Sequence, residues 1–243
     1  MKKLIAILLV LACVFALGAC NGNTQQPSGG LTPPPTTSAA QDLLDALSEV
    51  IRTSTPTQSK VSTVTGSQDV NLKSNLTITM GQLSGKDASL YVYEYESFNE
   101  LGAKEAKIKN VETKEYVEGM GLRVDVAKGG YWESEQSNFV RRITPYRMSL
   151  DATMIKSLLA NADGTEVSFV VPLENAADVF TSFDSKTLAS MNSDIFVKIK
   201  TDGTAVTYME MVYNIKNIPN IENPTVKVVA EYSYDLQSIT LLG

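Results

Sequence analysis

The segment IFVKIKTDGTAVTYMEMVYNI, residues 195–215, decides the fold. Apolar and polar residues alternate on both sides of Thr201–Thr204, and Asp-Gly within a short connection is a strong β-hairpin signal. The next run alternates in the same way, and its apolar positions are Val226, Val228, Ala230, Tyr232 and Tyr234. Antiparallel strands with one polar face form a sheet that is covered on one side only. The end of the chain therefore predicts an antiparallel sheet with a single apolar face.

Alternation with the same period indicates more strands earlier in the chain. They are expected at about 76–80, 89–97, 111–118, 122–128, 139–143 and 167–171. Gly81–Lys86 is one residue short of a phosphate-binding loop, and Asp87 stands where Ser or Thr would bind magnesium. We therefore interpret this segment as the turn of a hairpin.

Helical spacing of apolar residues appears in three places. The first predicted helix follows Ser38, its expected N-cap, and ends before Pro56. Two others are expected at about 151–162 and 174–183, and 98–109 is ambiguous but could form a short helix. Helices and strands together predict a single α+β domain.

The first twenty residues have the pattern of a secretory signal peptide. Lys2 and Lys3 precede an apolar run at 4–17, which is shorter than the roughly 20 residues that cross a bilayer. The exit sequence Leu17-Gly18-Ala19-Cys20 resembles the lipobox of bacterial lipoproteins, in which the Cys takes a diacylglyceryl group and becomes the mature N-terminus. We predict a signal peptide at 1–19 and attachment to the cell membrane, on its extracytoplasmic face, through acyl chains such as palmitate on Cys20. The alternative is an ordinary signal peptide, or an uncleaved anchor, with a chance cysteine.

A polar segment separates this anchor from the domain. Residues 21–38 are almost all Gly, Pro, Ser, Thr, Asn or Gln, which cannot bury enough apolar surface to fold. We predict a disordered tether over 20–38 and one folded domain over 39–243.

Composition excludes several classes of function. Without the signal peptide the chain carries 19 basic and 27 acidic residues, a net charge of −8, which disfavours nucleic acid. The chain has no histidine, and Cys20 is its single mature cysteine, so catalytic Ser-His-Asp and Cys-His sites and His-based zinc sites are excluded. We predict no catalytic residues, no cofactor and no metal site.

The order of these features resembles the LolA/LppX-like carrier lipoproteins. The resemblance rests on the pattern of Tyr116–Val126, Tyr131-Trp132, Asp194–Ile215 and Val226–Leu241. It implies a strongly curved antiparallel half-barrel with helices packed on its concave side, and an apolar groove between sheet and helices that holds acyl chains or lipoprotein anchors.

The residue types that suit such a groove are apolar and adaptable, as methionine is. The candidates are Met80, Met120, Leu122, Met209, Met211 and Tyr213. A groove and a plain hydrophobic core have the same composition, so these residues could equally be core. The one basic cluster is Arg141-Arg142 with Arg147, which could meet a lipid headgroup or a partner's carboxylate, or could serve only solubility.

The leading hypothesis is an extracytoplasmic lipoprotein that binds or shuttles a lipid-like apolar ligand and is not an enzyme. The alternative is an envelope interaction or structural lipoprotein with no small-molecule ligand, whose sheet or helices bind an envelope protein. An enzyme that uses two carboxylates, such as a glycan hydrolase, is a third hypothesis.

Overall fold

The computed structural model describes residues 30–67, 70–83, 85–99, 108–117, 121–124, 131–133, 143–218 and 221–240. The predicted signal peptide, Cys20 and the first part of the tether lie outside these residues. So do Met120, the ambiguous residues 100–107 and the predicted strand at 139–143 apart from Ile143.

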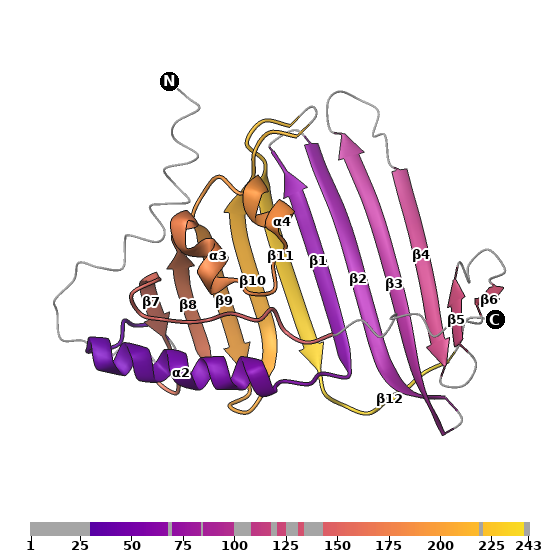
Figure 1. Ribbon diagram of the computed structural model, residues 1–243, viewed down its shortest axis with the longest axis horizontal. Helices are drawn as coiled ribbons and strands as arrows, with labels where there is room; N and C mark the ends of the chain where they lie inside the picture. Colours follow the sequence, from indigo (N-terminus) through magenta and orange to yellow (C-terminus); the bar gives the residue numbers. More distant parts are fainter. Residues whose placement is uncertain are drawn as a thin grey trace. The chain divides into compact units, whose positions relative to one another are not determined.

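The described strands form one sheet in the order β6-β5-β4-β3-β2-β1-β11-β10-β9-β8-β7, with β12 added to β2 (Figure 1). Neighbours along this order pair antiparallel, and β12 is parallel to β2. The strands are β1 Gln58–Gly66, β2 Val70–Leu83, β3 Lys86–Asn99, β4 Ile108–Val117, β5 Gly121–Val124, β6 Tyr131–Glu133, β7 Lys156–Ala160, β8 Glu166–Val171, β9 Ile195–Thr201, β10 Val206–Asn214, β11 Thr225–Ser233 and β12 Gln237–Ser238. The helices are α2 Thr37–Thr53, the 3-10 turn η2 Leu173–Asn175, α3 Ala176–Val179 and α4 Ser185–Ser190.

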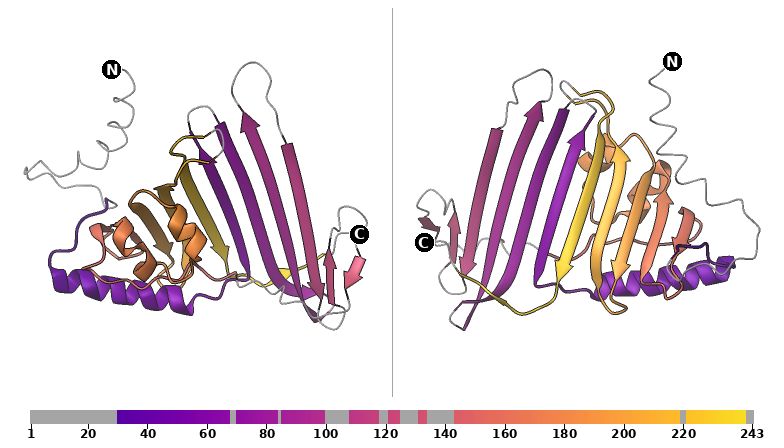
Figure 2. Two further views of the ribbon diagram at one scale, coloured as in Figure 1. Left: turned by 45° about the horizontal axis from the view of Figure 1, so that its top comes forward. Right: turned by 180° about the vertical axis from the view of Figure 1, so that it is seen from behind.

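This arrangement confirms the predicted fold class. The sheet is single, curved and open between β6 and β7, which are the two ends of its order, and the helices lie on its concave side (Figure 2). The predicted hairpins also form, since β9 pairs with β10 and β2 pairs with β3 through the turn at Gly85.

Strand register divides the sheet into two faces. Ala230 of β11 is in register with Met209 of β10 and Val61 of β1, and Val61 is in turn in register with Leu76 of β2. Because residues directly opposite each other in an antiparallel pair share a face, these positions lie on one side, the helix-side face. The alternate positions, such as Glu231 of β11, form the polar face.

Helix α2 covers the helix-side face at β7–β10 (Figure 1). Leu44, Leu47 and Ile51 follow the spacing i, i+3, i+7, so they lie on one side of the helix, where all three are buried. At its end the Ser54 hydroxyl donates to the Val50 carbonyl at 2.7 Å and accepts from the backbone N–H of Val206 at 2.9 Å. This buried serine joins the helix to the start of β10.

The core lies between these helices and β8–β11. Its largest fully buried side chains come from α2, α3 and alternate positions of the strands: Leu44, Val167, Phe169, Val171, Val179, Phe180, Ile195, Ile199, Met209 and Met211. The helices and the helix-side face of these four strands therefore share one hydrophobic cluster.

A segment without regular structure, residues 143–155, also runs across the helix-side face, and we call it the crossing segment (Figure 1). Ile143, Met148, Leu150 and Ile155 are buried in it. Backbone and side-chain groups of the helical layer form hydrogen bonds with its backbone. The Ser149 N–H donates to the Val179 carbonyl at 2.8 Å. The Gln41 side-chain oxygen likewise accepts from the Ala152 N–H at 2.9 Å, and the Asn175 amide donates to the Met154 carbonyl at 3.0 Å.

The helix predicted at about 151–162 is wrong, because its second half is strand β7. The pairing of β7 with β8 shifts register between Lys156 and Leu159, and Ser157 has a φ of 53°. Such a bulge places an extra residue in the strand, so that apolar residues fall at a spacing close to that of a helix. The pattern was real, but a bulged edge strand produced it.

Two other boundaries differ from the prediction. The expected helix at 174–183 is only η2 and α3, which end at Phe180, where ψ is 80°. The expected N-cap of α2 is wrong by two residues, because the Thr36 hydroxyl accepts from the Ala39 N–H at 3.1 Å and the helix begins at Thr37.

The folded unit begins at Leu31, within the predicted tether of 20–38. Thr32 exchanges two backbone hydrogen bonds, of 2.7 and 2.8 Å, with Ala160 of β7. An edge strand presents unpaired backbone groups, and a polar segment can satisfy them without burying any apolar side chain. Composition alone cannot reveal this kind of attachment.

Replacing Gly81 with alanine should detach the C-terminal segment from the sheet. A Cβ at this position of β2 would lie 2.2 Å from the backbone oxygen of Gln237 and 2.8 Å from its carbonyl carbon. Because those atoms are backbone, the segment must move, and we expect a loss of about 1–3 kcal/mol of stability. Hydrogen exchange should accelerate at the Ile239 amide, which donates to the Gln82 carbonyl at 3.3 Å.

The matched control is Gln82→Ala, an exposed neighbour in the same strand, which should leave exchange at Ile239 unchanged. Equal exchange at Ile239 in the Gly81 variant and the parent would contradict the expected clash.

Candidate functional site

Three of the predicted groove residues lie in the core. Met209 and Met211 of β10 are each 1% exposed, and Tyr213 of the same strand is 8% exposed. Burial also raises the pKa of the Tyr213 hydroxyl to about 12. Helices α2 and α3 cover this part of the sheet, so these side chains fill the space between the sheet and the helices.

Three aromatic side chains lie together at the edge of this core, next to the crossing segment. The rings of Phe180 and Phe183 stack with their centroids 4.8 Å apart, and Tyr146 of the crossing segment meets Phe183 edge to face at 5.7 Å. Burial raises the pKa of Tyr146 and of Tyr232 on β11, so both hydroxyls stay protonated. The hydroxyl of Tyr232 points to the sulfur of Met209 at 3.8 Å.

The helix-side face continues beyond this edge onto β1 and β2. Val61, Leu72 and Leu76 are half-buried there, whereas Ile78 is 6% exposed. None of the described helices lies over β2–β4 in either view of Figure 2. Val61, Leu72 and Leu76 thus form an apolar strip that lies beside the filled core rather than within it.

Met80 and Leu122 extend the same face away from the core. Met80 is half-buried on β2, in register with Ser89 of β3. Ser89 is in register with Tyr116 of β4, which is in register with Leu122 of β5. The six predicted residues therefore do not form one group, because three lie in the core, these two lie toward the far strands, and Met120 is not described.

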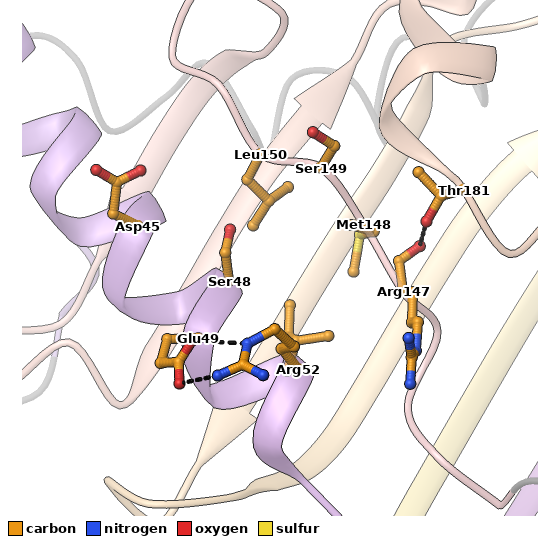
Figure 3. Close-up of a pocket in the computed structure, with 10 residues that line it drawn as sticks. Asp45, Ser48, Glu49, Arg52, Arg147, Met148, Ser149, Leu150 and Thr181 are labelled. Atoms are coloured by element: carbon orange, nitrogen blue, oxygen red, sulfur yellow. Dashed lines mark hydrogen bonds and ion pairs between the residues drawn. The ribbon is translucent and has the colours of Figure 1, made fainter.

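A cleft of about 380 Å³ opens on the solvent side of the helical layer, between α2 and the crossing segment (Figure 3). Its apolar lining is Ile51, Met148 and Leu150. Its polar lining is Asp45, Ser48, Glu49, Arg52, Arg147, Ser149 and Thr181. Of these lining residues the sequence singles out only Arg147, because the cleft depends on how the crossing segment lies against the helix.

The polar face carries a ladder of charges across four strands. Glu166 of β8 binds Lys198 at 2.5 Å and Lys200 at 3.1 Å, and Glu210 of β10 binds Lys227 of β11 at 3.0 Å. The hydrogen bond from Lys198 is the main cause that lowers the pKa of Glu166. The charged groups of these pairs are partly exposed, as expected on a face that contacts water. Each pair contributes at most about 1 kcal/mol to the stability of the fold.

In the part of the chain that the structure describes, no three His, Cys, Asp or Glu side chains lie together as a metal site would need. No helix among the described residues is both long and apolar enough to cross a membrane.

No protein-family model and no curated protein sequence matches the chain. Among solved structures it is similar to LprF from Mycobacterium bovis, with 10% identity and a TM-score of 0.38, over 87% of this chain and 100% of that one. It is also similar to a DUF1329 family protein from Desulfovibrio piger, with 12% identity and a TM-score of 0.26, over 86% of this chain and 96% of that one. At such TM-scores neither likeness speaks to function, and the fold assignment rests on the strand order and pairing above.

Proposed function

We propose that this chain is a membrane-anchored extracytoplasmic lipoprotein that binds or shuttles a lipid-like apolar ligand. The ligand would lie on the helix-side face of β1 and β2, against Val61, Leu72 and Leu76. The observation that carries the proposal is that, within the part of the chain that the structure describes, this apolar face is wider than the helical layer that covers it. The filled core under α2 and α3 would form one wall of this ligand site, and the crossing segment would form its border.

The chemistry of the strip suits an acyl chain. Val61, Leu72 and Leu76 are aliphatic, and Thr63, Thr65 and Ser74, which lie among them on the same face, bear no charge. An apolar ligand would therefore gain by covering the aliphatic side chains. The lipobox-like Leu17–Cys20 would keep the protein at the membrane from which such a ligand comes.

Replacing Leu76 with aspartate should weaken uptake of a fluorescent fatty acid about tenfold. The substitution puts a carboxylate where the acyl chain would lie, and the cost of burying it lowers the affinity. The measurement is a fluorescence titration of the chain carrying Cys20→Ser, so that the protein's own acyl chains do not compete, followed by organic extraction of bound lipid.

Thr77→Asp is the matched control, because Thr77 is the next residue of β2 and lies on the polar face. It should leave uptake unchanged, and Leu76→Ala tests the same site without a charge. A parent protein that carries no lipid and takes up no fatty acid would contradict the carrier role.

One observation favours a second function, an interaction lipoprotein with no small-molecule ligand. Met209, Met211 and Tyr213 are buried in the hydrophobic cluster beneath the helices, which supports a filled space there. The strip on β1 and β2 is then the remaining candidate for a lipid site. If it binds no lipid either, it would instead suit an envelope protein that docks on the sheet.

A further inference from the structure

The geometry points to a second binding site, which takes a neutral saccharide on the polar face of the sheet. A hollow of about 460 Å³ lies on this face over β11, β1 and β2. None of the described helices crosses it in the right-hand view of Figure 2. The side chains that line it from this face are Lys60, Ser62, Asn75, Thr77, Val229 and Glu231. Because the proposed lipid strip lies on the other face, this inference does not rest on it.

Strand register determines how these side chains are arranged. They form two rows of three with β1 in the middle, Glu231-Lys60-Thr77 and Val229-Ser62-Asn75. Neighbouring strands lie about 4.8 Å apart and alternate residues of one strand about 7 Å apart, so the six positions cover roughly 10 by 7 Å. That area is comparable to one sugar ring with its hydroxyl groups.

The polar side chains of the hollow have no partner among the described residues. Lys60 and Glu231 carry opposite charges at directly opposite positions, where such side chains normally attract each other, yet no ion pair joins them. The hydroxyls of Ser62 and Thr77 and the side-chain amide of Asn75 likewise make no hydrogen bond within the described part of the chain. The hollow therefore offers both donors and acceptors to a ligand.

The same face differs over β8, β9 and β10. There Glu166 binds Lys198 and Lys200, and Glu210 binds Lys227 of β11. The charged groups of these three strands thus satisfy one another, whereas those of the hollow are left for a ligand.

This mixture of groups suits neutral hydroxyls better than an ion. The charges of Lys60 and Glu231 sum to zero, so a phosphate or an ammonium ion that is attracted to one of them would be repelled by the other beside it. A sugar hydroxyl both donates and accepts. Glu231 would accept from one hydroxyl, while Lys60 and Asn75 would donate to the oxygens of others. Val229, the apolar member of the six, would contact the C–H side of the ring.

The test titrates the full-length chain carrying Cys20→Ser with two neutral saccharides, chitotriose and maltotriose, and follows binding by ligand-observed NMR. At least one of them should bind the parent. Ser62→Leu should weaken that binding at least tenfold, because the larger side chain fills the middle of the hollow. Val64→Leu is the matched control, since Val64 is the next residue on the same face of β1 and does not line the hollow.

Two further variants test the polar groups without filling the hollow. Lys60→Met and Glu231→Gln keep the approximate length of each side chain, and each should weaken saccharide binding about three- to tenfold. Lys73→Met is the control for charge, because Lys73 lies on the same face of β2 outside the hollow. It should leave the affinity unchanged.

Failure of both saccharides to bind the parent, or equal losses in Ser62→Leu and Val64→Leu, would overturn the inference. Glycine serves as a third probe, because a zwitterion could use the two charges and leave the other groups unpaired. Glycine binding that is tighter than saccharide binding and is lost in Lys60→Met would assign the hollow to a zwitterion and overturn the saccharide assignment. None of these outcomes alters the fatty-acid uptake tested at Leu76, so the two proposals fail separately.

Discussion

Replacing Met211 with alanine is expected to lower the free energy of unfolding by about 2–5 kcal/mol. Met211 is 1% exposed at the centre of β10, in register with Val197 of β9 and Val228 of β11. Truncation removes buried apolar atoms and leaves a cavity that packed neighbours on both strands cannot close fully. Urea denaturation followed by circular dichroism measures the change, and a constant m-value shows that it lies in stability.

This substitution also separates a core from a groove. If Met211 belongs to the core, the folded variant should still take up a fluorescent fatty acid with the affinity of the parent. Leu236→Ala is the control for stability, because Leu236 is 81% exposed and its truncation should change stability by no more than about 0.5 kcal/mol. A small stability change at Met211 together with lost uptake would place the ligand between β10 and the helices.

Replacing Cys20 with serine is expected to release almost all of the protein from the membrane. In the proposed anchor the acyl group would be attached through the sulfur of Cys20, and a hydroxyl does not substitute for the thiol in that step. Once the predicted signal peptide is removed, the charge of the remaining chain offers no compensating attraction, since its net charge of −8 is repelled by anionic headgroups. Fractionation of cells and incorporation of labelled palmitate measure the two consequences.

Cys13→Ser is the matched control, because Cys13 lies inside the predicted signal peptide and should not be lipidated. It should leave both membrane attachment and palmitate labelling unchanged. A Cys20→Ser protein that still pellets with membranes would show that the N-terminal segment remains as an uncleaved anchor.

Local pattern was enough to predict most of the strands and the first helix. The alternation in 195–215 and around Asp202-Gly203 depends on neighbours in sequence, and the structure has β9 and β10 there, paired antiparallel. The spacing of Leu44, Leu47 and Ile51 likewise predicted α2, which buries those three residues. In both cases a single period determines which side chains share a face.

The candidate site was predictable only as a set of residue types. Met80, Leu122 and Met211 are all apolar strand residues, yet Met211 is in the core whereas Met80 and Leu122 lie on strands beyond it. Nothing in their local sequence distinguishes them, because the difference arises from which strands the helices cover.

The sequence by itself therefore determined that the end of the chain forms a sheet with one apolar and one polar face, and it predicts a lipobox-like anchor at the start. The tertiary structure decided the rest. The strand order places the N-terminal β1 beside the C-terminal β11, Thr32 pairs with the edge of β7, and the crossing segment closes against α2 to form the cleft. These contacts join residues far apart in sequence and are made largely by backbone groups, which every residue carries, so no local pattern of side chains encodes them.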